Sequence, residues 1–116
     1  MRENIVKQKS FNFALLIIEL YKKLVKRNEF VLSKQILRSG TSIGANIEES
    51  IGAQSRNDFI SKISISYKEA RETKYWLKLL LGGKYITQEE FNIYIDEITI
   101  ILKLLTAIQK TTKENH

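Results

Sequence analysis

Apolar and polar positions in the middle of the chain alternate with the period of an α-helix. Leu32, Ile36, Ser39, Ile43 and Ile47 recur at steps of three and four residues. On a helix with 3.6 residues per turn these positions share one face. We therefore predict a helix from about Val31 to Ser50 whose apolar face packs into a core.

The next segment carries a seven-residue repeat. Ser55 and Asp58 have the spacing of a capping box with Asp in place of Glu, which predicts the start of a helix. Its inward positions then alternate steps of four and three: Phe59, Ile63, Ser66, Ala70, Thr73, Leu77 and Leu80. Such a repeat predicts left-handed, coiled-coil-like packing. The small residues in its middle predict a close approach to the preceding helix.

The first and last segments are each apolar on two sides. We predict a first helix over about 10–27 with Ser10 as its N-cap. Its main apolar face is Ala14, Ile17, Tyr21, Leu24 and Val25, and its second face is Phe13, Leu16 and Leu20. The pair Gly82-Gly83 ends the third helix, and a capping box from Thr87 to Glu90 starts the fourth. That helix has the stripe Phe91, Tyr94, Ile98, Ile101, Leu105 and Ile108, and a second strip Ile93, Ile100, Leu104 and Ala107.

Four amphipathic helices joined by short turns predict an all-α fold, an antiparallel up-down-up-down four-helix bundle. A chain of 116 residues is long enough for one core, so we predict a single domain over 1–116. Residues 1–9 are expected to form a loosely held arm and residues 110–116 a frayed tail. The surplus apolar faces on the first and fourth helices predict a homo-oligomer.

Two glycines, Gly40 and Gly44, lie inside the predicted second helix beside its apolar stripe. Each costs about 1 kcal/mol relative to alanine in a helix, so the pair needs a reason. Tight packing against another helix is the favoured explanation, and close approach of a ligand is the alternative. The opposite flank carries a polar row, Gln35, Arg38, Ser42, Asn46 and Glu49. That row is either a boundary or subunit-contact stripe whose members satisfy one another or a ligand cluster.

Composition limits the classes of protein to consider. The chain has no cysteine and no proline, so disulfides and thiolate metal sites are excluded and long helices are permitted. Its N-terminus lacks a signal-peptide pattern, and charges interrupt every apolar run well before the roughly 20 residues that a membrane span needs. We therefore expect a soluble cytoplasmic protein.

Catalytic and metal chemistry find little support in the residues. The only histidine is His116, which excludes histidine-based triads and multi-histidine metal sites. Glu69 and Glu72 lie beside Lys68 and Arg71, which indicates ion pairs on a helix surface. We predict no enzyme activity, no cofactor and no metal.

Positive charge gives the better hypothesis. The chain carries 19 Lys and Arg against 13 Asp and Glu, a net charge of +6. The surplus lies in residues 1–28 and 54–85 and favours polyanions, although solvated helical proteins often have a similar one. The candidate nucleic-acid-binding residues are Lys22, Lys23, Lys26 and Arg27 in the first helix and Arg71, Lys74 and Lys78, beside Tyr75 and Trp76, in the third. The alternative is a solvated rim whose lysines pair with nearby glutamates.

Three stretches carry a family resemblance: Arg38 to Glu49 (RSGTSIGANIEE), Asp58-Phe59 and Lys68 to Leu77 (KEARETKYWL). They resemble the signature of the bacterial four-helix-bundle family encoded in the intervening sequences of 23S ribosomal RNA genes, over about Phe11 to Ala107. The resemblance implies a ring-like homopentamer. It also implies kinship with the accessory proteins of diversity-generating retroelements, similar pentamers that bind nucleic acid and a reverse transcriptase. Glu48-Glu49-Ser50 departs from the pattern, because many relatives have a small residue or glycine there.

The residues and the resemblance together favour a non-catalytic oligomer that binds DNA or RNA with low specificity. The alternative is a structural or adaptor oligomer that recruits a protein partner, such as a reverse transcriptase. A membrane partner is not expected.

Overall fold

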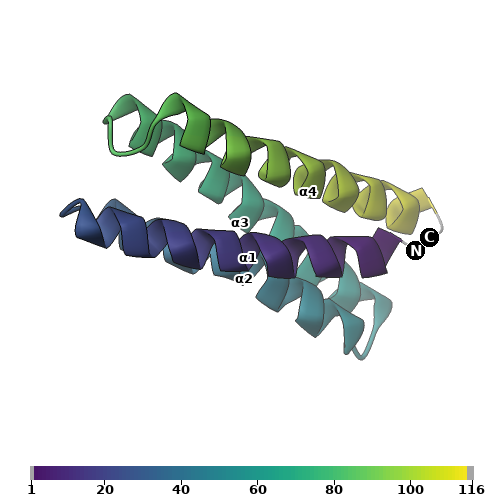
Figure 1. The fold of residues 1–116 in the computed structure, drawn as a ribbon. Helices are drawn as coiled ribbons and strands as arrows, with labels where there is room; N and C mark the ends of the chain where they lie inside the picture. Colours follow the sequence, from purple (N-terminus) through teal and green to yellow (C-terminus); the bar gives the residue numbers. More distant parts are fainter. Residues whose placement is uncertain (1, 115–116) are drawn as a thin grey trace.

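Four long helices that alternate in direction make up residues 2–114, the part of the chain that the computed structural model describes (Figure 1). They are α1 (Arg2–Lys26), α2 (Leu32–Ile51), α3 (Arg56–Gly82) and α4 (Gln88–Glu114). Each helix contacts two others, α1 and α3 both packing on α2 and on α4. The predicted all-α, up-down-up-down bundle is confirmed. No helix in residues 2–114 is both long enough and apolar enough to cross a membrane.

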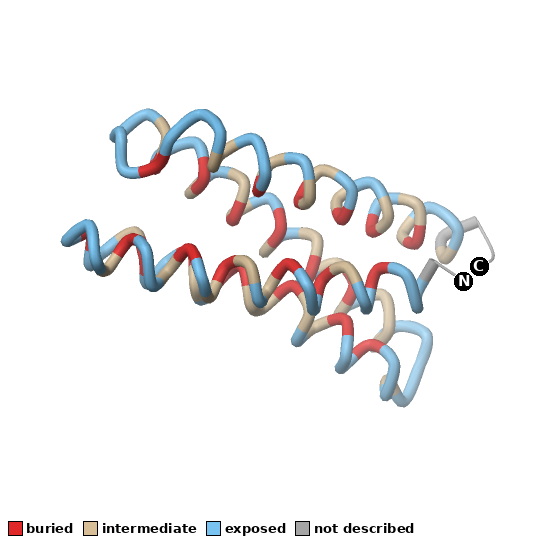
Figure 2. The backbone as a smooth tube through the Cα atoms, in the orientation of Figure 1, coloured by how far each residue is buried: buried red, intermediate tan, exposed pale blue. Residues whose placement is uncertain are grey.

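The core lies along the inward faces of the helices, where buried positions recur every three or four residues (Figure 2). The predicted stripes of the last three helices are confirmed, except that Leu32, Phe59 and Phe91 at their ends are only half-buried. The buried members are Ile36, Ser39, Ile43 and Ile47 of α2, Ile63, Ser66, Ala70, Thr73, Leu77 and Leu80 of α3, and Tyr94, Ile98, Ile101, Leu105 and Ile108 of α4.

The first helix differs from its prediction. It begins at Arg2, so residues 2–9 are helical in place of the predicted arm. Val6 is fully buried, and that burial favours continuing the helix toward the N-terminus. Ser10 is buried inside the helix, where its hydroxyl donates to the carbonyl of Lys7 at 3.0 Å, so it is not an N-cap.

The division of α1 into two apolar faces is also wrong. A single core face runs along the helix: Val6, Ser10, Phe13, Ile17, Leu20 and Leu24. The other predicted members, Ala14, Leu16, Tyr21 and Val25, are half-buried on its flanks. Phe13 and Leu20 therefore lie in the bundle's own core and give no support to an oligomer.

The last helix continues through most of the predicted tail, to Glu114. The guanidinium of Arg56, at the start of α3, donates to the carbonyl of Thr112 at 2.6 Å and holds the final turns. The predicted tail is therefore helical over residues 110–114. Met1, Asn115 and His116 lie outside the described residues.

Small residues bring α2 close to both of its neighbours. The hydroxyl of Ser66 on α3 donates to the backbone carbonyl of Ile43 at 2.9 Å, and the hydroxyls of Thr73 and Ser39 are 2.8 Å apart. On the other side, a β-carbon at Gly40 would lie 2.9 Å from two side-chain carbons of Ile17 on α1. The predicted tight packing is confirmed, and α1 is the helix that packs against the glycines.

Two of the helix N-termini are capped as the sequence predicts, and a third has a cap that was not predicted. Thr87 and Glu90 form the predicted reciprocal capping box, with the Glu90 N–H 3.1 Å from the Thr87 hydroxyl and the Thr87 N–H 2.9 Å from the Glu90 carboxylate. The Ser55 hydroxyl likewise accepts the N–H of Asp58 at 3.0 Å. Before α2, the buried Glu29 accepts the N–H groups of Val31 and Leu32 at 3.2 and 3.0 Å. The sequence predicted only a turn there, because Glu is not among the favoured N-cap residues.

Candidate nucleic-acid interface

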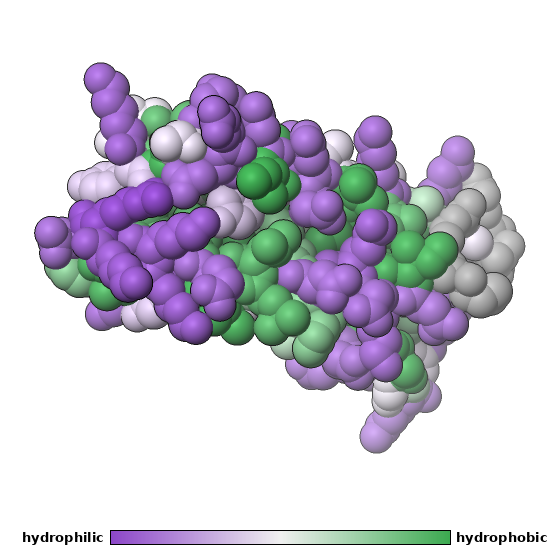
Figure 3. All heavy atoms as spheres, in the orientation of Figure 1, coloured by the Kyte–Doolittle hydropathy of each residue, from purple (hydrophilic) through white to green (hydrophobic). Residues whose placement is uncertain are grey.

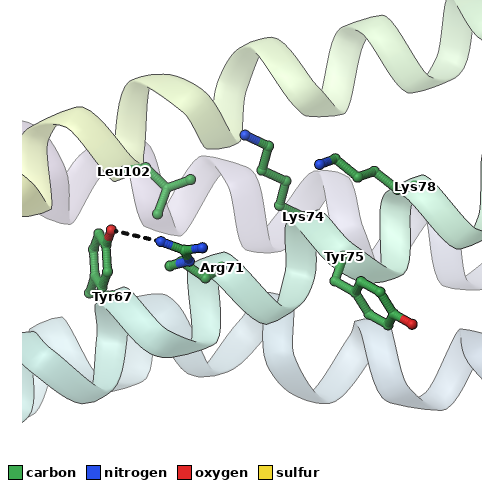
Figure 4. A pocket seen from close by; sticks show the side chains of 6 residues that line it. All are labelled: Tyr67, Arg71, Lys74, Tyr75, Lys78 and Leu102. Carbon is green, nitrogen blue, oxygen red and sulfur yellow. Dashed lines mark hydrogen bonds between the residues drawn. The ribbon is translucent and has the colours of Figure 1, made fainter.

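Three of the predicted cations meet on the outward face of α3. Arg71, Lys74 and Lys78 recur at steps of three and four residues, which places them on one side of the helix. Together with Tyr67 and Tyr75 of α3, and with Leu102 of α4, they line a hollow of ≈ 360 Å³ (Figure 4). We call this group of six side chains the α3 hollow. Two lining residues were not predicted: Tyr67, although it lies one turn before Arg71, and Leu102, for which the sequence near it carries no signal.

The cations of the α3 hollow have no carboxylate partner within the described residues. The acids of the same helix, Glu69 and Glu72, both pair with Arg38 of α2, the former at 3.2 Å. The predicted ion pairing of these glutamates is confirmed, but their partner is Arg38 of the neighbouring helix and not Lys68 or Arg71. Both carboxylates lie on the side of α3 that faces α2, where Arg38 reaches them.

Arg71 is held in place by an aromatic side chain. Its guanidinium carbon lies 5.9 Å from the ring centroid of Tyr67, and Nη1 donates to the Tyr67 hydroxyl at 3.4 Å. A cation over an aromatic face is stabilised by the quadrupole of the ring. The contact orients the guanidinium and leaves its charge uncompensated, so it can still attract an anion.

Tyr75 is supported by a row of contacts that starts on α2. Its ring meets that of Trp76 edge to face, with centroids 5.4 Å apart. The indole N–H of Trp76 donates to Glu72 at 3.0 Å, and Glu72 pairs with Arg38. The sequence placed Tyr75 and Trp76 beside the cations, but the role of Arg38 depends on a contact between two helices.

The predicted basic cluster of α1 is not a set of four free cations. The guanidinium of Arg27 donates two hydrogen bonds to the carboxylate of Glu90, at 3.0 and 2.8 Å, and one to the carbonyl of Tyr85 at 2.9 Å. These contacts fasten the end of α1 to the turn before α4. Arg27 therefore acts in the structure as a link between two helices.

The other members of the cluster differ in their partners. Lys22 lies 3.4 Å from a carboxylate oxygen of Glu19, and Lys23 lies 3.9 Å from one of Glu90. Lys26 forms no ion pair with any of the described residues. Since α1 and α3 lie diagonally across the bundle, the cluster and the α3 hollow are separate sites.

The link between Arg27 and Glu90 changes acid–base behaviour. The hydrogen bond from Arg27 lowers the pKa of Glu90 to about 2 from its usual 4.5, against the opposing effect of burial. The same hydrogen bond raises the pKa of Arg27. Because the carboxyl pKa is lower in the folded state, the link stabilises the fold fully above about pH 4.5 and is lost as the pH falls toward 2.

We expect Glu90→Gln to lower the free energy of unfolding at pH 7 by about 1–2 kcal/mol. The figure is below what the full pKa shift implies, because the side chain of Arg27 is 39% exposed and water screens the pair. Urea denaturation at pH 7 and pH 3 measures the effect, and the gap between variant and wild type should shrink at pH 3. Glu89→Gln, at an exposed position one residue earlier, is the matched control and should change stability little. An equal loss in both variants would contradict the assignment.

Metal binding gains no support from the geometry. The described residues contain no group of three or more His, Cys, Asp or Glu side chains placed to hold a metal ion. Glu90 caps α4 and pairs with Arg27, and Glu69 pairs with Arg38.

The chain is similar in sequence and in structure to known proteins. The family model described as 23S rRNA-intervening sequence protein matches residues 2–107. A crystal structure of a protein with unknown function from the S23 ribosomal protein family of Bacteroides thetaiotaomicron is 57% identical in sequence, and the alignment covers 95% of this chain and 99% of that one with a TM-score of 0.94. No curated protein matches the chain. The kinship with retroelement accessory proteins stays a prediction. The family match spans nearly the whole bundle, and the chain belongs to the family of 23S rRNA-intervening sequence proteins.

Proposed function

We propose that the protein is a non-catalytic oligomer that binds nucleic acid with little sequence specificity, through its phosphates. One observation carries the proposal: the α3 hollow gathers, beside two tyrosines, three cations that have no carboxylate partner in the part of the chain that the structure describes. Unpaired cations in a hollow attract a polyanion more strongly than cations already paired on the surface. The net charge of +6 acts in the same direction.

Low specificity follows from the kind of side chain present. Phosphate contacts by Lys and Arg fix position on the strand but read no bases. The α3 hollow holds neither Asn nor Gln, the side chains that read adenine by paired hydrogen bonds. Affinity should therefore depend on salt far more than on sequence.

Exposed apolar side chains on α1 and α4 support an oligomer. Figure 3 shows apolar side chains gathered along these two helices on the face turned to the viewer. Phe11 and Leu15 of α1 are 60% and 49% exposed, and Ile93 of α4 is 56% exposed. We propose that they form contacts between subunits of a homo-oligomer with the pentameric ring form that the family resemblance implies. A ring would repeat the α3 hollow and multiply weak phosphate contacts.

The test is a fluorescence-anisotropy titration of labelled oligonucleotides at several salt concentrations. We expect tight binding at low salt and a log–log slope of about one unit per phosphate contacted. Scrambling the oligonucleotide sequence should leave the affinity nearly unchanged. Absence of binding at low salt by the intact oligomer would remove the proposal.

An adaptor that recruits a protein partner is the second candidate. Phe30 and Val31, in the turn between α1 and α2, are 52% and 70% exposed, and adjacent exposed apolar side chains are typical of protein contacts. If the oligomer fails to bind nucleic acid, cross-linking through this turn in the native host would test the adaptor. A partner whose capture is abolished by Phe30→Ser would support it.

A further inference from the structure

The ring of Tyr75 is the most exposed aromatic surface in the α3 hollow. The residue is 55% exposed, yet its edge-to-face contact with Trp76, at an interplanar angle of 61°, restrains the ring. Trp76 is itself fixed by its hydrogen bond to Glu72. A restrained ring with an exposed face is suited to stacking, because little conformational freedom is lost when a second planar group binds.

The hollow has a basic edge and an aromatic edge. Lys74 extends toward α4, whereas Tyr75 points to the opposite side of α3 (Figure 4). Arg71 and Lys78 lie four residues before and three residues after Tyr75, so they flank it by roughly one turn in each direction. Phosphates on both sides of one stacked base would meet a cation.

Size favours a single strand over a duplex. The hollow of ≈ 360 Å³ is at the low end of the volumes that hold small ligands, so it suits one nucleotide. In a duplex the base faces are covered by their neighbours, and only phosphates and groove edges are accessible. A duplex would therefore leave Tyr75 unused.

We infer that the α3 hollow binds single-stranded nucleic acid, with phosphates on Arg71, Lys74 and Lys78 and an unstacked base on the ring of Tyr75 at the edge of the hollow. The inference rests on the proposed function and adds the class of ligand. Base stacking on one aromatic side chain changes affinity by roughly five- to 150-fold. The preference for single strands over duplex should fall in that range.

The experiment compares four labelled probes of equal length on the intact protein: single-stranded RNA, single-stranded DNA, the DNA duplex, and a DNA strand with abasic sites. The abasic strand keeps the phosphates and removes the bases. We expect single-stranded RNA and the unmodified single-stranded DNA each to bind at least about fivefold more tightly than the duplex and the abasic strand. Trp76, the only tryptophan of the chain, contacts Tyr75. Its fluorescence should therefore change when single-stranded RNA or unmodified single-stranded DNA binds, and not with the duplex or the abasic strand.

Two variants complete the test. Tyr75→Leu should abolish the preference, whereas Tyr75→Phe, which keeps the ring, should retain it. The melting temperatures of both should match wild type, because the side chain is largely exposed. If all four probes bind equally and Tyr75→Leu is silent, the single-strand inference is wrong while phosphate binding stands. If no probe binds at low salt, the proposed function itself fails.

Discussion

Replacing Gly40 by leucine is expected to lower the free energy of unfolding by about 3 kcal/mol or more, because the side chain has no room. Even a β-carbon at this position would lie 2.9 Å from Cγ1 and Cγ2 of Ile17, and Ile17 is fully buried. To make room for leucine, α1 and α2 must separate, and this exposes buried apolar side chains of both helices to water. Ala70→Leu, at a fully buried position on α3, should have a comparable effect. Thermal and urea denaturation followed by circular dichroism measure both.

Controls separate this steric effect from the general effect of removing a glycine. A β-carbon at Gly82 would meet nothing within 4 Å, so Gly82→Ala should be neutral or stabilise by up to about 1 kcal/mol. Ala45→Ser, at an exposed position, should also be mild. If Gly40→Leu melts like wild type, the α1–α2 contact is not as close as described.

Replacing Arg71, Lys74 and Lys78 together by glutamine should weaken nucleic-acid binding on the order of 100-fold at low salt. The salt slope should fall by about two units for single strands, since each lost phosphate contact removes roughly 0.7 unit. The three side chains form no ion pair with other described residues, so the fold should persist. Anisotropy at four or more salt concentrations gives both numbers.

A second triple variant tests whether place matters or only total charge. Lys34, Lys103 and Lys110 are exposed and lie outside the α3 hollow. Changing all three to glutamine removes the same charge. Binding by this variant should stay close to wild type, and an equal loss in both variants would mean that net charge alone attracts the nucleic acid.

Periodicity predicted the middle of the bundle because α2 and α3 have one apolar stripe each. Ser66 and Thr73 were correctly placed inside although they are polar, since they continue the seven-residue repeat of α3. Ser39 was correctly placed because it continues the apolar stripe of α2. In α1 the run Phe13 to Ile18 is apolar at every position, so several faces match equally well. Only contact with α2 and α4 selects the one that is buried.

The candidate site was predictable where it depends on one helix. The spacing of Arg71, Lys74 and Lys78 placed them together, and the structure does so. Which cations are free depends on partners far along the chain: Arg38 reaches Glu69 from 31 residues away and Arg27 reaches Glu90 from 63. Local charge patterns cannot reveal such pairs, because they arise only when the helices pack.

The even number of antiparallel helices has a practical consequence for moving the chain termini. Since α1 and α4 pack against each other and run in opposite directions, the beginning of α1 and the end of α4 lie at the same end of the bundle (Figure 1). The Arg27–Glu90 link lies at the other end. A short linker could therefore join the two helices and new termini could be opened in the exposed turn at Gly52, which gives a circular permutant with every helix contact retained.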